Sequence, residues 1–249
     1  SIGDYFNMPR RGDGYLPEDP YQAYADGACK DVDFIIGTNA DEWRYWVAEV
    51  GPNWKNFPDM TEEEANQNVE TYKEYIAQVK WDEANAKATD AEKENLQKVL
   101  DSVDEKELVW KQTEIANDTG FRIPSVVCAE NHAKAGGKSY MYYFGKKNTL
   151  FDWLGACHAT ELSYVFHNLE GNEGFSGTVE EGLADNMCYL WVSFAKDGDP
   201  STDAVEWTPY TPENRETLMI GNDCSLKMEN DPKSEQTKLM LPFAFYYLK

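Results

Sequence analysis

Val32-Asp33-Phe34-Ile35-Ile36-Gly37 is a short apolar run closed by a glycine, which is typical of a buried strand in a parallel sheet. Thr38-Asn39-Ala40-Asp41-Glu42 follows at once, and we expect it to form a loop at the carboxyl end of that strand. In open α/β sheets, ligands and catalytic groups gather at this edge. By pattern alone, the favoured interpretation of Asp41 and Glu42 is a cap for a helix that starts near Trp43.

Further strands are predicted in the second half of the chain. Ser139 to Phe144 is rich in aromatic residues and predicts a strand that ends at Gly145. Leu218 to Ile220 and Ser225 to Met228 flank Gly221-Asn222, which predicts a short hairpin. Helices and strands alternate, so the sequence predicts an α/β fold with few strands and many flanking helices.

Much of the helical content is expected in a highly charged segment at about residues 55–119, whose apolar residues recur at helical spacing. Another helix is expected from Phe121 to Ala135, because Pro124 suits its first turn and Gly136-Gly137 follows its end. Capping boxes, which pair a Thr with a Glu three residues later, mark three helix starts, at Thr61–Glu64, Thr89–Glu92 and Thr178–Glu181.

Composition excludes several classes of function. The 249 residues carry a formal net charge of −22, and this repulsion argues against nucleic-acid binding. The longest apolar runs are too short for a membrane span. Five scattered cysteines form no CxxC pair, which argues against zinc ribbons and thioredoxin chemistry. No P-loop or dinucleotide fingerprint occurs either, so neither a metal site nor a cofactor is expected. Their odd, sparse number favours a reduced, cytoplasmic compartment, with secretion left open.

Only three histidines are present, and one of them stands out. We interpret His132, within the helix after Pro124, and His167, after an apolar run, as structural or surface residues. His158 is in a loop beyond a predicted strand, among the small residues Gly155, Ala156 and Ala159. Loops on a rigid sheet are where catalytic groups concentrate, so His158 is the candidate base. Taken alone, its local sequence favours a structural role and a functional role equally.

Six segments, in the same order and rough spacing, resemble the type B carboxylesterases, the family of the cholinesterases and bacterial p-nitrobenzyl esterases. They are Asp13–Pro20 (DGxxLPxxP, one residue shorter), Ile36–Glu42 (IGTNxDE), Phe121–Pro124 (FxxP), Gly155–Phe166 (GAxHGxELxxVF), Phe194–Pro200 (FAxxGDP) and Trp207–Tyr210 (WPxY, with the proline displaced by one). The resemblance covers nearly the whole chain outside residues 51–119, and it implies an α/β-hydrolase fold.

The resemblance also assigns roles at the predicted site. It implies that Glu42 is the acid of a catalytic triad, that His158 is the general base, and that Glu161 is a buried supporting residue. Two positions depart from the family pattern. Trp43 and Ala159 both replace a glycine, and Trp43 is expected to narrow or reshape the pocket.

The nucleophile of such a triad is not found. In this fold it sits in G-x-S-x-G and precedes the acid, but the only serine before Glu42 is Ser1, and Gly174-Phe175-Ser176-Gly177 follows His158. Cys157 is unsuitable as the nucleophile, because it directly precedes His158, and the side chains of adjacent residues in an extended loop point away from each other. We therefore expect residues 1–249 to be the C-terminal half of a carboxylesterase catalytic domain that hydrolyses small-molecule esters by acyl transfer.

This interpretation carries expectations about partners. Alone, the chain is expected to be inactive, and the N-terminal half of the same protein is expected to dock on the apolar flank of the Val32–Gly37 strand. Without that half, the exposed flank would invite self-association. The alternative function is a non-catalytic, cholinesterase-like binding module, and the least specific interpretation is an acidic α/β domain of unassigned role.

Overall fold

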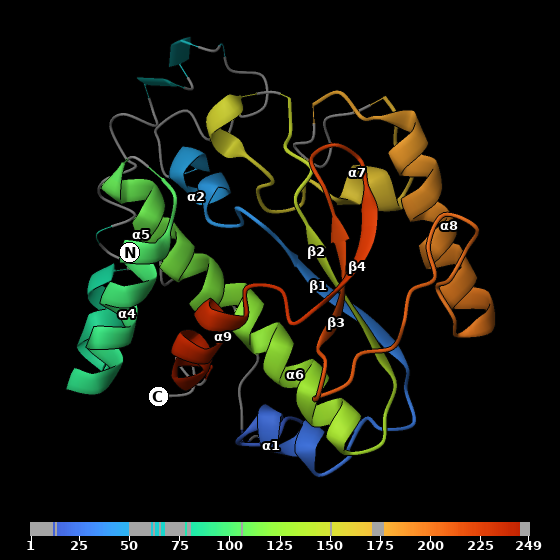
Figure 1. Ribbon diagram of the computed structural model, residues 1–249, viewed down its shortest axis with the longest axis horizontal. Helices are drawn as coiled ribbons and strands as arrows, with labels where there is room; N and C mark the ends of the chain where they lie inside the picture. Colours follow the sequence, from blue (N-terminus) through green and yellow to red (C-terminus); the bar gives the residue numbers. More distant parts are fainter. Residues whose placement is uncertain are drawn as a thin grey trace.

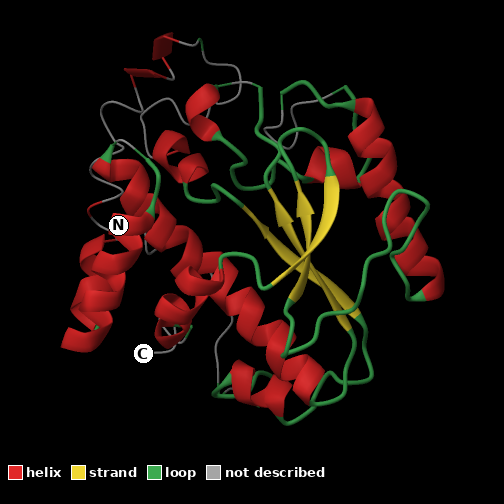
Figure 2. Ribbon diagram, viewed as in Figure 1, coloured by secondary structure: helices red, strands yellow, loops and turns green. Residues whose placement is uncertain are grey.

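In the part of the chain that the structure describes, one four-stranded sheet forms the centre (Figure 2). The computed structural model describes residues 12, 14–49, 61, 63–64, 66–67, 78, 81–105, 107–149, 151–170 and 177–244. The strands are β1 (Phe34–Asn39), β2 (Ser139–Phe144), β3 (Glu216–Ile220) and β4 (Leu226–Asn230), and they lie in that order across the sheet. The first three run parallel, and β4 returns antiparallel to β3, which confirms the predicted hairpin.

The first strand begins later than the sequence predicted. Val32 lies in a turn, where its N–H donates to the carbonyl of Cys29 at 2.9 Å, and its side chain is exposed. Pairing with β2 runs from Phe34 to Asn39. Thr38 and Asn39, which were expected in a loop, are therefore the last residues of the strand, and the loop that carries Glu42 is correspondingly short.

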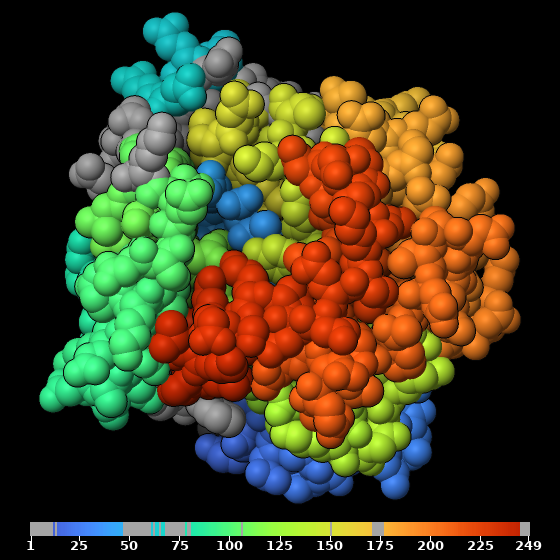
Figure 3. Space-filling view, viewed as in Figure 1, coloured from blue at the N-terminus to red at the C-terminus, as the bar shows by residue number. Residues whose placement is uncertain are grey.

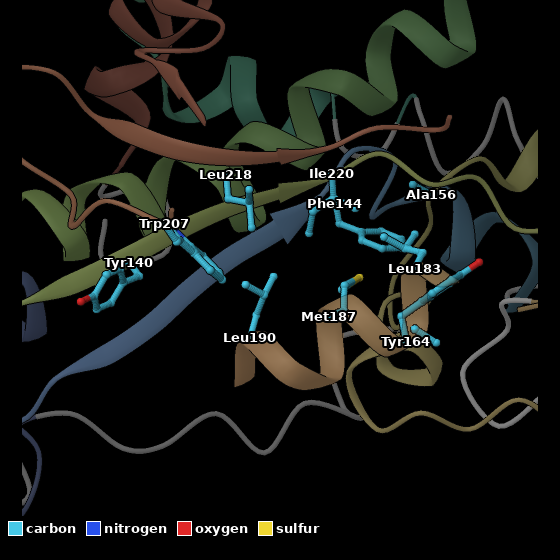
Figure 4. Close-up of a cluster of buried hydrophobic side chains, with 11 residues drawn as sticks. Tyr140, Phe144, Ala156, Tyr164, Leu183, Met187, Leu190, Trp207, Leu218 and Ile220 are labelled. Atoms are coloured by element: carbon cyan, nitrogen blue, oxygen red, sulfur yellow. The ribbon is translucent and has the colours of Figure 1, made fainter. Parts of the chain in front are cut away.

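Helices cover both faces of the sheet (Figure 1). Alternate residues of β2 point to opposite faces, as the pleat requires. Tyr140 and Phe144 pack with helix α8 (Glu181–Asp197), whose Leu183, Met187 and Leu190 point toward the strands (Figure 4). On the other face, Met141 packs with Val126 and Ala129 of α6 (Ile123–Lys134). The sheet is thus the middle layer of an α/β/α arrangement.

A second core joins the helices beside the sheet. It contains Leu96, Val99 and Leu100 of α4 (Asp90–Ser102), Ile115 of α5 (Leu108–Asn117), Ile123, and Met240 of α9 (Ser234–Met240). In the space-filling view, α4 lies beside α9 (Figure 3). Between α5 and α6 the chain stays helical through one π-helical turn, η3 (Asp118–Arg122), so the helix that was predicted to start at Phe121 continues α5.

The remaining elements are short. Helix α1 (Pro20–Ala25) packs against α6, and α2 (Arg44–Glu49) follows the acid loop. Further short elements are η4 (Asp152–Leu154), α7 (Leu162–Val165) and η5 (Leu241–Phe243). No helix among the described residues is both long and apolar enough to cross a membrane.

Two of the three capping boxes are confirmed. Thr89 and Glu92 bond reciprocally at the start of α4, and Thr61 and Glu64 do the same. Residues 68–77, over which the helix after Thr61 was expected to continue, lie outside the described part. The third box is wrong: α8 begins at Glu181, and the backbone N–H of Thr178 donates to the hydroxyl of Thr149 at 2.7 Å.

Candidate active site

Two loops at one edge of the sheet build the candidate site. Because β1 and β2 are parallel neighbours, their carboxyl ends meet, and Glu42 follows the first while His158 lies in the loop after the second. The backbone N–H of Asp41 donates to the carbonyl of Ala156 at 3.0 Å, and the N–H of Ala156 donates to the Asp41 carboxylate at 2.9 Å. A Cβ on Gly155 would lie 2.2 Å from Oδ2 of Asp41, so only glycine permits this approach.

Glu42 and His158 are in direct contact. Oε2 of Glu42 lies 2.6 Å from Nδ1 of His158, a length typical of a charge-assisted hydrogen bond. Glu42 is 5% exposed, whereas the side chain of His158 is 42% exposed. The carboxylate accepts a hydrogen bond from the Nδ1–H of His158, which leaves Nε2 as the ring nitrogen that can act as a base. The arrangement therefore suits an imidazole that takes up a proton while a buried carboxylate stabilises its charge.

Asn39, the last residue of β1, connects the two loops. Its backbone N–H donates to Oε1 of Glu42 at 2.8 Å, which fixes the oxygen that does not touch the histidine. Its side-chain Nδ2 donates to the carbonyl of Cys157 at 2.8 Å and to Oε2 of Glu161 at 2.5 Å. Glu161 therefore reaches the pair through Asn39, and burial raises the pKa of its carboxyl group.

Three aromatic rings lie close to the ring of His158. The ring centroid of His158 lies 4.8 Å from that of Trp46, 5.4 Å from that of Phe121 and 6.1 Å from that of Tyr45. Trp43, which is 8% exposed, packs behind them, with its centroid 4.8 Å from Trp46. These rings give the imidazole apolar neighbours, while its side chain stays 42% exposed.

The two departures from the family pattern lie within this region. Trp43 belongs to the aromatic cluster, and its effect on a substrate pocket stays a prediction. Ala159 has a φ of 67°, in the left-handed region that an L-residue adopts at a cost and that glycine adopts freely.

The other candidate groups lie elsewhere. His132 is fully buried, with Nε2 3.1 Å from the carbonyl of Cys29, so it is structural as predicted. His167 pairs with Asp185 at the surface, with Nε2 and Oδ1 2.8 Å apart. Cys157 is fully buried, and burial raises the pKa of its thiol to about 12, which makes it unsuitable as a nucleophile.

Neither of the two lookalike nucleophiles can be placed. Ser1 and Ser176 both lie outside the described residues. Within the described part of the chain, no group of His, Cys, Asp and Glu side chains is placed to hold a metal ion. All five cysteines are free thiols.

Sequence reasoning missed the residues that hold the pair in place. Asn39 stands inside the quoted IGTNxDE segment, so its position was marked, but no role was assigned to it. Tyr45 and Trp46 follow the acid within a few residues, and only their nearness in sequence could have indicated them.

The sequence is similar to that of known proteins over most of its length. The sequence profile of the carboxylesterase family matches residues 3–240. The para-nitrobenzyl esterase of Bacillus subtilis is 29% identical over 246 residues, which cover 97% of this chain and 44% of that protein. The bile salt-activated lipase of Bos taurus is 29% identical over 233 residues, covering 83% of this chain and 35% of that protein.

The structural comparison agrees. A solved para-nitrobenzyl esterase superposes with a TM-score of 0.59 at 26% identity, covering 90% of this chain and 41% of that one. The chain thus spans less than half the length of the relatives it matches. The match confirms the predicted α/β-hydrolase architecture, represented in this chain by a small mixed sheet with many helices.

Proposed function

The chain belongs to the carboxylesterase family, and on that premise we propose that it is the C-terminal portion of a carboxylic ester hydrolase. In this proposal Glu42 is the acid of the catalytic triad and His158 is the general base. The observation that carries it is the 2.6 Å contact between Oε2 of Glu42 and Nδ1 of His158 at the carboxyl edge of the parallel strands.

The proposed reaction is acyl transfer to water. A serine hydroxyl attacks the ester carbonyl while Nε2 of His158 takes the hydroxyl proton, and Glu42 stabilises the imidazolium that forms. The tetrahedral intermediate collapses, the bond to the alcohol breaks, and the alcohol leaves with the proton from His158. Water then attacks the acyl-serine by the same route, which releases the carboxylic acid and restores the serine.

We place the nucleophilic serine on a part of the protein that precedes this sequence. In this fold the chain order is serine, acid, histidine, and no G-x-S-x-G occurs in residues 1–249. The match to 44% of the B. subtilis esterase is consistent with a longer protein that contains the missing element.

The same proposal assigns a docking surface to β1. Among the described strands, β1 lies at one edge of the sheet and carries no charged residue. The opposite edge strand, β4, exposes Lys227 and Glu229, charges that discourage further pairing. We propose that the preceding part of the protein pairs with β1, and that the chain alone self-associates through this edge.

The test is hydrolysis of p-nitrophenyl esters by the chain alone and by the chain co-expressed with the preceding part of the protein. Alone, the chain is expected to be no faster than free imidazole, and co-expression is expected to give turnover that His158→Ala abolishes. His167→Ala is the matched control, because His167 also pairs with a carboxylate but lies at the surface. Turnover that survives His158→Ala would refute the proposal.

A further inference from the structure

One buried amide contacts the backbone on both sides of Glu42. Asn117 is the last residue of α5 and is 5% exposed. Its Oδ1 accepts the backbone N–H of Trp43 at 2.9 Å, and its Nδ2 donates to the carbonyl of Ala40 at 3.0 Å. Ala40 and Trp43 flank the two acidic residues of the loop, so a single side chain spans the turn that presents Glu42.

The chemistry of these contacts requires an amide. One partner is a backbone donor and the other a backbone acceptor, and an asparagine offers both functions within one planar group. An aspartate would retain the contact to Trp43 but could not donate to the carbonyl of Ala40. An alanine would leave both backbone groups without this partner, and buried backbone groups are costly to leave unsatisfied.

The helical turn that follows Asn117 is bonded to helix α9. The π-helical turn η3 follows directly, and π-turns are frequent at functional sites. Phe121 of this turn contacts His158, whereas Asp118 and Arg122 bond to α9. Arg122 donates to the Thr237 hydroxyl at 2.7 Å. The turn therefore contacts His158 through Phe121 and α9 through Asp118 and Arg122.

We infer that Asn117 is a positioning residue, whose amide fixes the backbone around Glu42 and so sets the contact between Glu42 and His158. The inference rests on the proposed function of that pair. It requires no contact between Asn117 and the substrate. A displacement of about 1 Å in such a site lowers the rate by on the order of 10²-fold, which sets the expected size of the effect.

Two readouts test the inference, and a structural role alone would move neither. The first is the far-downfield proton resonance of the hydrogen bond between Nδ1 of His158 and Glu42, assigned by its loss in Glu42→Gln. The second is kcat against KM for p-nitrophenyl acetate in the co-expressed protein. The variants are Asn117→Ala and the near-isosteric Asn117→Asp. The control is Asn131→Ala, which removes an amide contact to the carbonyl of Tyr21 at the far end of α6.

We expect Asn117→Ala to lose or strongly shift the resonance and to lower kcat by on the order of 10²-fold at unchanged KM. Asn117→Asp should give a smaller change, and Asn131→Ala none. A resonance and kcat like those of the wild type in both Asn117 variants would overturn the inference. Failure of both to fold would overturn it too, because Asn117 would then be a general stabilising residue.

The outcomes also separate this inference from the proposed function. If Glu42→Gln abolishes the resonance and the activity but the Asn117 variants do not change them, only the inference fails. If Glu42→Gln leaves activity unchanged, the proposed function fails.

Discussion

The ion pair between Arg122 and Asp118 offers a direct test of how the helices behind the site are held. Nε of Arg122 lies 2.6 Å from Oδ1 of Asp118, and the guanidinium also donates to Oδ2 at 3.0 Å. Arg122 is 7% exposed and Asp118 is 1% exposed. In Arg122→Met the Asp118 carboxylate would stay buried, with the side chain of Gln236 as its donor.

The expected cost follows from that burial. Removing one partner of a buried pair costs about 3–5 kcal/mol, because the remaining charge is not compensated. A domain of ordinary stability has about 5–15 kcal/mol in total, so the loss is a large share of it. With a urea m-value of about 2 kcal/mol per M, the unfolding midpoint should fall by about 2 M. Adding Asp118→Asn should recover part of the loss, since it removes the stranded charge.

The assay is equilibrium urea unfolding, followed by circular dichroism. Lys134→Met is the matched control, because Lys134 and Glu130 have the same i,i+4 spacing with Nζ and Oε1 2.5 Å apart. The side chain of Lys134 is 55% exposed, so the change should cost less than about 1 kcal/mol. Equal costs for Arg122→Met and Lys134→Met, or no recovery with Asp118→Asn, would refute the reasoning.

Three further predictions concern the loop around the histidine. Burial raises the pKa of the Cys157 thiol to about 12. Cys157 should therefore resist alkylation by iodoacetamide at pH 8 in the folded chain and react in urea, which peptide mass spectrometry would measure. Rapid labelling of the folded chain would contradict this. Ala159→Gly should raise the free energy of unfolding by about 0.5–1 kcal/mol. Glycine relieves the strain of the left-handed φ, which is worth about 1–2 kcal/mol, but its greater backbone entropy in the unfolded state costs about 0.5–1 kcal/mol. A lower melting temperature than that of the wild type would contradict this. Burial raises the pKa of Glu161 above its ordinary value of 4.5, so the folded state binds that proton more tightly than the unfolded state. The free energy of unfolding should therefore fall as pH rises from about 4.5 through the raised pKa, and Glu161→Gln should remove this slope in melting curves; an unchanged slope would show that another group is responsible.

Local signals in the sequence were sufficient for the strands and for the loop that carries Glu42. The run at Phe34–Gly37 is apolar and contains the β-branched Ile35 and Ile36, and the strand ends only two residues after it, so the strand was placed to within a turn. The role of Glu42 as the acid stays a prediction. The hairpin at Gly221-Asn222 and the helix start at Thr89 depend on turn and cap chemistry, which is local as well. Thr178 failed as a cap because a hydroxyl distant in sequence, that of Thr149, took its backbone N–H.

Long-range contacts were beyond such reasoning. Asn117 contacts residues more than 70 positions earlier in the chain, and nothing in its neighbours marks it as different from other helix-end asparagines. The π-turn at Asp118–Arg122 was not predicted either, and the partners of Asp118 and Arg122 in α9 lie more than 100 positions later in the chain. Glu42 and His158 were paired only through the resemblance, since their residues alone left a structural interpretation open.

The central claim is that a buried carboxylate holds the imidazole of His158 in its catalytic tautomer. The most direct measurement is kcat for p-nitrophenyl acetate in the co-expressed protein with Glu42→Gln, compared with Glu105→Gln, which alters a more exposed carboxylate paired with Arg44. The glutamine would present its NH₂ group to Nδ1, so kcat should fall by on the order of 10⁴-fold, while Glu105→Gln should change it little. The loss of the tautomer predicts a fall in kcat of about 10⁴-fold, so a fall of less than about tenfold in Glu42→Gln would contradict the account.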